Sequence, residues 1–364
     1  MRRKPPRPSG YLTPEDRDRL TTIRREIDDV FDDVIGTPAR VALVGYPYDG
    51  NVGNHMMWLA IASYLRERRI RIAYAANLHP DPRRTGLHLD GLASAIGTDP
   101  ILFVGGVSMS RLWPHHADAK RVIAERFNAN RLISLTSTML FADDEERHAA
   151  STMFAGHPDV TLLARDSRSA AEARQVFGDC VSVRAIHDSA LRLQLEPSRP
   201  QGGRLLWLRR DDVESTAAAV DSEVVTFDWS NDLRAVDPVA YYAMRSARAC
   251  SQLRSTRPGR IVRRPLNRYI VGAFGFGTRR IVAFGQRTLD QGPVLVTDRM
   301  HPHLLAVLRG QDVVLLPDRF GKNRATYESS TSGFSVVQWA EEPTEALRLA
   351  TERLADRGAP IDAR

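Results

Sequence analysis

Short, uninterrupted apolar runs alternate with amphipathic stretches along most of the chain. Runs of this kind are typical of parallel strands that are buried on both faces of a sheet. We therefore expect strands at residues 41–45, 71–76, 101–104, 132–135, 160–164, 205–208, 224–227, 294–297 and 313–316. Amphipathic spacing predicts helices at residues 13–34, up to 68, 116–127, from 143, 167–177, 238–253, 302–309 and 342–357.

This alternation predicts an α/β fold with two doubly wound, Rossmann-like domains facing a cleft. A chain of 364 residues suits two domains better than one. Residues 196–203 contain two prolines and two glycines and form the clearest linker. The expected divisions are a basic tail with the N-terminal helix (1–38), an N-terminal Rossmann-like domain (39–195), the linker (196–203), a C-terminal Rossmann-like domain (204–340) and a C-terminal helix (341–364).

Charge changes this picture in one region. Between residues 245 and 287 the chain carries eleven arginines and no acidic residue. Such a segment attracts nucleic acid, an acidic lipid surface or a diphosphate-bearing substrate, or it forms solvated helices. Aromatic residues do not interleave with the arginines as base stacking requires, so we expect no nucleic-acid partner.

The ends and the cysteines indicate the compartment. No apolar run approaches the ~20 residues of a membrane-spanning helix, and the basic start is not followed by an apolar core. Cys180 and Cys250 lie far apart, which predicts neither a disulfide scaffold nor a metal site. We expect a cytoplasmic protein without a metal, with peripheral contact at the inner face of an anionic membrane as a further expectation.

Two glycine-containing loops follow the first and third predicted strands. Residues 49–54 read Asp-Gly-Asn-Val-Gly-Asn, and residues 105–113 begin with a double glycine and end in a tryptophan. Glycines let backbone amides approach a ligand closely, and a helix N-terminus follows each loop. Ser108, Ser110 and Trp113 are candidates to line a sugar site; the alternative for both loops is a plain tight turn.

A buried arginine is predicted at the end of the fifth strand. Arg165 there is costly unless it meets an anion or a carboxylate. Asp166 or Ser167 is expected to cap the next helix. Asp188, farther along, is either a general base or the partner of an arginine.

The most informative loop follows the strand predicted at residues 294–297. Asp298, Arg299 and His301 lie between that strand and the next helix, and the loop of residues 317–323 adds cationic side chains. Histidine exchanges protons near neutral pH, while arginine and lysine bind carboxylate and phosphate. A histidine beside an arginine at a strand's carboxyl end therefore favours an anion-handling site over an inert surface.

Taken in order, these motifs resemble the polysaccharide pyruvyl transferase family, in its bacterial exopolysaccharide branch. They are the loop at 51–54, the double-glycine loop ending at Trp113, Ala-Arg-Asp-Ser at 164–167, Asp-Ser-Ala at 188–190, Leu-Arg-Arg-Asp-Asp-Val-Glu at 208–214, Asp-Trp at 228–229, Asp-Arg-Met-His at 298–301 and Gly-Lys-Asn at 321–323. The resemblance covers roughly residues 40–330.

The resemblance implies a two-domain fold similar to B-type glycosyltransferases, and transfer of the enolpyruvyl group of phosphoenolpyruvate onto sugar hydroxyls. The product is a ketal, phosphate is released, and no cofactor is needed; the acceptor is a sugar or a lipid-linked glycan. The implied catalytic residues are His301, Arg299 and Asp188, and the implied phosphoenolpyruvate-binding residues are Arg165, Arg299, Lys322 and Asn323. The implied acceptor-binding residues are Asn51, Gly53, Asn54, Gly105, Gly106 and Trp113.

Three departures from the family pattern keep alternatives open. Asn54 replaces a frequent aspartate, Pro302 follows the histidine, and Thr-Ser-Thr at 136–138 replaces Pro-Gln-Ser. A nucleotide-sugar glycosyltransferase remains an alternative, for which Asp318 and Glu328 are the candidate ribose-binding carboxylates. A catalytically inactive binding homologue is the third hypothesis.

Overall fold

The fold is that of a computed structural model. It describes residues 12–79, 81, 84–107, 109–111, 113–209, 225–227, 229, 232–256, 259 and 261–357. The basic tail at 1–11, Ser108, residues 210–214 and Asp228 lie outside the described residues.

The first sheet has six parallel strands in the order β2-β1-β3-β4-β5-β6. Five of them coincide with the apolar runs predicted from sequence, and β6 was not predicted. The strands are β1 (Arg40–Tyr46), β2 (Arg71–Asn77), β3 (Ile101–Phe103), β4 (Leu132–Ser137), β5 (Val160–Ala164) and β6 (Ser182–Ala185).

The second sheet has five parallel strands in the order β11-β10-β9-β7-β8. The strands are β7 (Leu205–Leu208), β8 (Val225–Phe227), β9 (Val294–Thr297), β10 (Asp312–Leu315) and β11 (Val337–Trp339). Two parallel sheets confirm the predicted α/β class with two Rossmann-like parts, and β11 is an addition to the predicted strands.

Both sheets follow the same winding rule. In each, the first strand lies between the second and the third, so the chain changes direction across the sheet between β1 and β3 and again between β7 and β9. Ligands of open α/β sheets bind at the carboxyl ends of strands where this change occurs. The loops that follow β1, β3 and β9 are therefore the positions to inspect.

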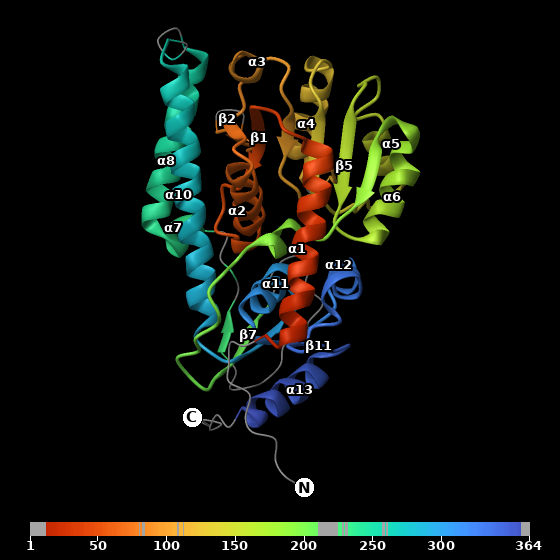
Figure 1. The fold of residues 1–364 in the computed structure, drawn as a ribbon, viewed down its shortest axis with the longest axis vertical. Helices are drawn as coiled ribbons and strands as arrows, with labels where there is room; N and C mark the ends of the chain where they lie inside the picture. The colour runs from red at the N-terminus through yellow and green to blue at the C-terminus, as the bar shows by residue number, and fades with distance from the viewer. Residues whose placement is uncertain are drawn as a thin grey trace. The chain divides into compact units, whose positions relative to one another are not determined.

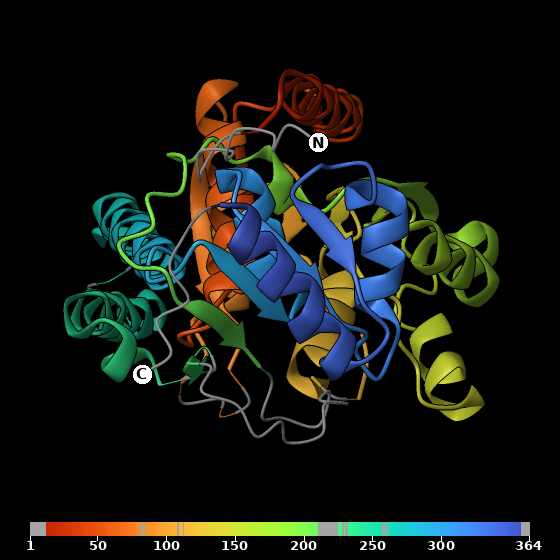
Figure 2. The same cartoon turned by 90° about the horizontal axis from the view of Figure 1, so that it is seen from below.

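Helices cover the sheets in both parts of the chain (Figures 1 and 2). In sequence order they are α1 (Pro14–Ile35), α2 (Val52–Glu67), α3 (Leu89–Ile96), α4 (Pro114–Arg126), α5 (Asp144–Ser151), α6 (Ser167–Phe177), α7 (Leu233–Val236), α8 (Pro238–Gln252), α10 (Arg263–Leu289), α11 (Met300–Arg309), α12 (Lys322–Thr326) and α13 (Pro343–Asp356). One face of the second sheet packs on α13, where Val294, Val296 and Val314 meet Ala346 and Ala350 in one apolar cluster. Burial of such alanines and valines in contact is the main source of stability for each layer.

Internal contacts divide the chain into two compact units. The first-sheet unit comprises Arg25–Ser189 and Asn231–Ile281, and the second-sheet unit comprises Met1–Arg24, Ala190–Ser230 and Val282–Arg364. Residues 231–281 thus group with the first sheet although they follow the predicted linker in sequence. The predicted division at 196–203 and the cleft between two domains stay predictions.

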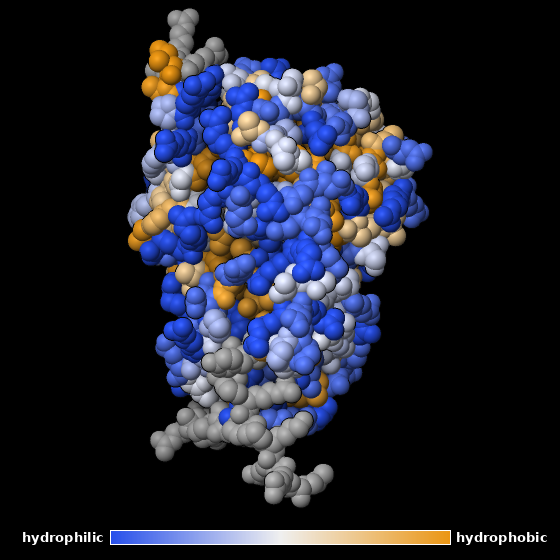
Figure 3. Space-filling model, viewed as in Figure 1, coloured by the Kyte–Doolittle hydropathy of each residue, from blue (hydrophilic) through white to orange (hydrophobic). Residues whose placement is uncertain are grey.

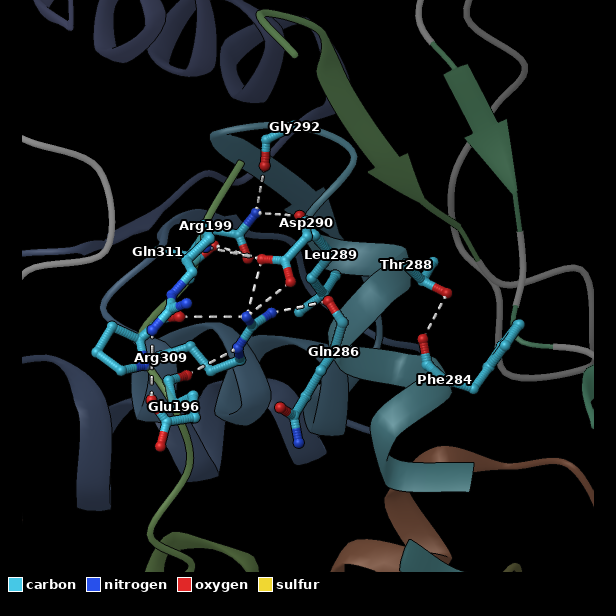
Figure 4. Close-up of polar contacts among 12 residues, drawn as sticks. Glu196, Arg199, Phe284, Gln286, Thr288, Leu289, Asp290, Gly292, Arg309 and Gln311 are labelled. Carbon is cyan, nitrogen blue, oxygen red and sulfur yellow. Dashed lines mark hydrogen bonds and ion pairs between the residues drawn. The ribbon is translucent and has the colours of Figure 1, made fainter. Parts of the chain in front are cut away.

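The predicted linker is held firmly within the second-sheet unit (Figure 4). Arg309, only 3% exposed, binds the Asp290 carboxylate at 2.8 Å and donates to the Glu196 carbonyl oxygen at 3.1 Å. Asp290 also accepts from the backbone N–H of Arg199 at 2.9 Å. A buried ion pair needs such additional partners to offset its desolvation, and here they fix the linker to the end of α10.

Among the described residues, no helix is long and apolar enough to cross a membrane.

Candidate functional site

The carboxyl end of β9 places a compact cationic loop at the switch point of the second sheet. The Thr297 hydroxyl donates to the Leu208 carbonyl oxygen at 2.7 Å and accepts from the Arg299 N–H at 3.0 Å. This pair of bonds ties the loop to the neighbouring strand β7. Helix α11 begins at Met300, so His301 lies in its first turn, where the helix presents its positive end.

The loop after β10 is braced against this cationic loop by one side chain. Asn323, which is buried, donates from Nδ2 to the Asp298 carbonyl oxygen at 2.7 Å and to the Leu316 carbonyl oxygen at 2.8 Å. The Asp318 carboxylate accepts from the Asn323 N–H at 2.7 Å. Because Lys322 precedes Asn323 and opens α12, the brace brings the lysine backbone to the same edge as Arg299.

Asn323 therefore has a clear structural task at this edge. Both hydrogens of its amide go to backbone carbonyl oxygens, so its geometry supports a positioning function. The expected contact of Asn323 with phosphoenolpyruvate stays a prediction.

A second histidine lies one position beyond Pro302 and has a different environment from His301. His303 has no exposed surface, and burial, with a smaller contribution from His301, lowers its pKa to about 3. It is consequently neutral near pH 7 and adds no positive charge beside His301. Within the described part of the chain, neither ring nitrogen of His303 has a hydrogen-bond partner.

The loop after β1 forms a self-contained turn in the first-sheet unit. Asn51 caps α2 by accepting from the Gly53 N–H at 3.0 Å, and the Asp49 carboxylate accepts from the Asn51 N–H at 3.0 Å. The other Asp49 oxygen accepts from Asn54 Nδ2 at 3.2 Å. Desolvation raises the pKa of Asp49 to about 6, against the lowering effect of these hydrogen bonds. The capping function fits the plain-turn alternative, and Val52, Gly53 and His55 at the start of α2 are buried.

The double glycine after β3 is required by the neighbouring strand. A Cβ on Gly105 would lie 2.1 Å from the Leu135 carbonyl oxygen and 2.3 Å from that of Thr136. Gly106 has a φ of +103° and bridges to Ser137 of β4. The close approach at these glycines is thus to backbone within the sheet.

Trp113 lies at the N-cap of α4 and is not packed into the core. It is 48% exposed, and its ring centroid lies 6.1 Å from that of His115. An exposed indole beside polar groups is suited to stacking against a ligand. The packed-tryptophan alternative is therefore wrong for this residue.

The charge of Arg165 is met inside its own unit. Its guanidinium lies 3.0 Å from the Asp188 carboxylate, and the two side chains are 4% and 1% exposed. Asp166 caps α6 by accepting from the Ser169 N–H at 2.6 Å, which confirms the capping interpretation. Of the two alternatives for Asp188, the structure therefore supports pairing with an arginine. Any part that the pair plays in phosphoenolpyruvate binding or proton transfer stays a prediction.

A buried lysine near the double-glycine loop has no counterpart among the predicted site residues. Lys120 of α4 is 1% exposed and donates to Ser134 Oγ at 3.2 Å, and Ser134 Oγ lies 3.0 Å from Ser137 Oγ. Burial lowers the pKa of Lys120 to about 7. In the sequence this residue is one of three cations in an amphipathic helix, beside Arg121 and Arg126, which is the pattern of solvated side chains.

The described residues contain no group of three or more histidine, cysteine, aspartate or glutamate side chains placed to hold a metal ion.

The predicted site residues fall into two sets. Arg299, His301, Lys322 and Asn323 belong to the second-sheet unit, and the second set belongs to the first-sheet unit. That second set is Asn51, Gly53, Asn54, Gly105, Gly106, Trp113, Arg165 and Asp188. In the second-sheet unit Asn323 binds the Asp298 carbonyl oxygen, and in the first-sheet unit Arg165 pairs with Asp188. Whether both sets serve one cleft stays a prediction.

The fold and these edges define a two-sheet α/β protein with a cationic, histidine-containing loop at a strand switch point. Residues 51–315 match the polysaccharide pyruvyl transferase family. The match extends over more than half of the chain, so this protein belongs to the polysaccharide pyruvyl transferase family.

Individual relatives are distant but extend over most of the chain. "Putative pyruvyl transferase EpsO" of Bacillus subtilis is 21% identical over 83% of this chain and 88% of its own length. "Pyruvyl transferase 1" of Schizosaccharomyces pombe is 24% identical over 86% of this chain and 76% of its own length. The crystal structure of an uncharacterised Klebsiella pneumoniae protein matches with a TM-score of 0.52 at 14% identity, covering 88% of this chain and 98% of that one, and so supports the fold.

Proposed function

We propose that this protein transfers the enolpyruvyl group of phosphoenolpyruvate to two hydroxyls of a sugar in a glycan or glycan precursor. A cyclic ketal forms and phosphate leaves. The observation that carries the proposal is the Asn323 brace, which ties the Arg299–His301 loop to the loop bearing Lys322 at a sheet edge where ligands bind. Family membership supplies the reaction class.

The donor suits this set of side chains. Phosphoenolpyruvate has a carboxylate and a phosphate, and Arg299 with Lys322 supplies two fixed cations for them. Cations held in place before the reaction also stabilise charge on the departing phosphate. The positive end of α11 adds to this field at His301.

The proton balance assigns the remaining functions. His301, in its protonated form, gives a proton to the methylene carbon of the donor, and C2 then accepts the first sugar hydroxyl, which loses its proton. The C2–O bond to phosphate breaks, and the second hydroxyl adds at C2 and also loses a proton. Of the two hydroxyl protons, one restores His301 and the other leaves with the phosphate as hydrogen phosphate. Asp298 and Asp188 are the candidate proton acceptors, and general acid–base assistance of this kind contributes about 10²–10⁴-fold.

The acceptor belongs in this proposal to the first sheet. Trp113 offers an exposed ring, and the Asn51–Asn54 turn forms the N-terminus of α2. The reaction requires this edge and the cationic edge to face one cleft during turnover, as in B-type glycosyltransferases. A lipid-linked or polymeric exopolysaccharide precursor made in the cytoplasm is the proposed acceptor class.

The nucleotide-sugar alternative loses support from the same loops. Asp318, one candidate for ribose, accepts from the N–H groups of Phe320 and Asn323. Glu328, the other candidate, is paired with Arg324 at 2.6 Å on the surface. Both carboxylates therefore have partners within the chain.

Release of inorganic phosphate from phosphoenolpyruvate, measured with a panel of sugars and lipid-linked glycans, tests the proposal. We expect phosphate release only with a competent acceptor, and thermal stabilisation by phosphoenolpyruvate that exceeds stabilisation by nucleoside diphosphates. Stronger stabilisation by a nucleotide would support the glycosyltransferase alternative. If phosphoenolpyruvate neither binds nor turns over with any acceptor, the result supports a catalytically inactive homologue.

A further inference from the structure

Exposed apolar side chains concentrate on one element of the first-sheet unit. Helices α8 and α10, with the turn between them, form an antiparallel hairpin, here the α8–α10 hairpin, residues 238–281 (Figure 1). Of eight large hydrophobic residues with exposed side chains in the described part of the chain, seven lie on it and the other is Trp113. The seven are Val239, Tyr242, Leu253, Ile261, Val262, Tyr269 and Phe276.

The two helices pack closely, so their outer faces form one surface. Ser246 Oγ of α8 lies 2.7 Å from the Tyr269 hydroxyl of α10. A Cβ on Gly277 would lie 2.5 Å from Met244, so this glycine allows α10 to approach α8. Exposed residues recur at Tyr242, Arg245 and Ala249 of α8 and at its C-cap Leu253, which is the spacing of one helix face.

The charged residues of this surface all have one sign between residues 245 and 287. Some of the arginines have partners: Arg254 is buried and donates to Asn267 at 2.9 Å, and Arg280 pairs with Asp237 at 3.0 Å. Others are exposed and, within the described residues, take part in no ion pair. They are Arg245, Arg264, Arg268 and Arg279.

Apolar and cationic side chains therefore alternate on the same outward face. On α10 the exposed positions include Arg264, Arg268, Tyr269, Phe276 and Arg279. Apolar atoms also gather at the tip of the hairpin, beside strongly hydrophilic ones (Figure 3). Ile261, at this tip, is 87% exposed and Val262 is 48% exposed.

One partner matches both features. An anionic lipid bilayer offers negative headgroups to the arginines and an apolar layer beneath them to the aliphatic tip. A second copy of the chain would set two acid-free arginine surfaces against each other, and like charges repel. Nucleic acid would use the arginines, but it offers no apolar layer to Ile261 and Val262.

We propose that the outer face of the α8–α10 hairpin docks on an anionic membrane surface, with the tip at Ile261 and Val262 entering the interfacial layer. The exposed arginines contact the lipid headgroups, and the contact is peripheral. This surface is separate from the residues of the proposed reaction, so the two proposals can fail independently.

Co-sedimentation of the full chain with vesicles tests the docking surface. The vesicles contain phosphatidylcholine with about one third phosphatidylserine, and pure phosphatidylcholine vesicles serve for comparison. We expect binding to the anionic vesicles that weakens as salt rises. Replacing Arg264, Arg268 and Arg279 by serine should lower the partition coefficient at least about tenfold.

A second variant separates the apolar contribution from the charge. Ile261→Ser with Val262→Ser keeps every charge and should lower anionic-vesicle binding by about tenfold. Serine substitutions at the exposed arginines Arg25, Arg66 and Arg348 remove the same charge elsewhere and should leave most of the binding intact. Melting temperatures establish that each variant is folded.

Three outcomes would overturn the proposal. The first is no binding to anionic vesicles at low salt. The second is an equal loss for the control triple and the hairpin triple. The third is that the protein binds a DNA duplex but no vesicles, and that the Ile261→Ser/Val262→Ser variant binds the DNA as well as the wild type does.

Discussion

The two sheets share one strand order, yet the loops at their carboxyl edges carry different chemistry. The second sheet presents Arg299, His301 and Lys322, while the first presents an asparagine turn, a double glycine and Trp113. The charge of Arg165, the buried cation of the first edge, is neutralised by an ion pair with Asp188. The proposed function assigns an anionic donor to the second edge and a neutral sugar to the first, although the two sheets have similar topology.

The largest expected effect concerns the proposed proton donor of the second edge. His301→Ala should lower kcat for phosphate release by about 10²–10⁴-fold, because protonation of the methylene carbon then lacks its general acid. The KM for the acceptor should change little. His148→Ala, which removes an exposed histidine from α5, is the matched control and should retain full activity. An unchanged kcat in His301→Ala would remove this residue from the mechanism.

The next prediction tests whether the ion pair of Arg165 with Asp188 stabilises the folded protein. Asp188→Asn leaves the Arg165 guanidinium buried without its counter-charge and should lower the free energy of unfolding by about 3–5 kcal/mol. Asp159→Asn breaks an exposed pair with Arg131 in the same unit and should cost at most about 1 kcal/mol. Urea denaturation measures both. Equal, small costs would show that Arg165 is not held mainly by Asp188 and would favour a ligand as its partner.

A pH effect follows from the buried lysine of the first-sheet unit. Burial lowers the pKa of Lys120 in the folded chain to about 7, from the ordinary lysine value of 10.5. Between these values the unfolded chain binds a proton that the folded chain does not, so stability rises with pH there. Below about pH 7 both states are protonated, and the full cost of burying the charge is present.

Comparison with Lys120→Met isolates this contribution. The unfolding free energy of the wild type minus that of the variant should rise by about 1.4 kcal/mol per pH unit between pH 7 and 10. Chemical denaturation at several pH values measures this difference. The contributions of the other titrating groups to the two unfolding free energies largely cancel in it. A flat difference would show that Lys120 stays charged in the folded protein.

Sequence patterns located the elements that have a strong local signal. Val160–Ala164 and Ser167–Phe177 were predicted at the bounds that the structure has, because an unbroken apolar run and a capped amphipathic helix are local signals. Strand β6 has exposed and half-buried positions and so lacks an apolar run. Helix α10 contains several glycines, which weaken the helical signal although packing against α8 stabilises it.

The candidate site could be predicted only where its residues lie close together in one segment of the sequence. Asp298, Arg299 and His301 are consecutive or nearly so, and their loop follows a clear strand. The need of Arg165 for an anion was visible, but Asp188 becomes its neighbour through the pairing of β5 with β6, a strand the sequence did not reveal. The Asn323 brace likewise depends on adjacent strands, which a linear pattern does not contain.

The smallest expected effect tests the sugar side of the comparison. Trp113→Ala removes an exposed ring, so the melting temperature should hold while the KM for a glycan acceptor rises about tenfold, a typical cost of losing one stacking contact. The KM for phosphoenolpyruvate should stay constant. Tyr242→Ala, an equally exposed aromatic on the α8–α10 hairpin, should alter neither constant when the acceptor is free in solution. A residue on the sugar side has no reason to change phosphoenolpyruvate binding. If the KM for phosphoenolpyruvate rises instead, the first edge binds the anionic donor, and the proposed assignment of the two edges is wrong.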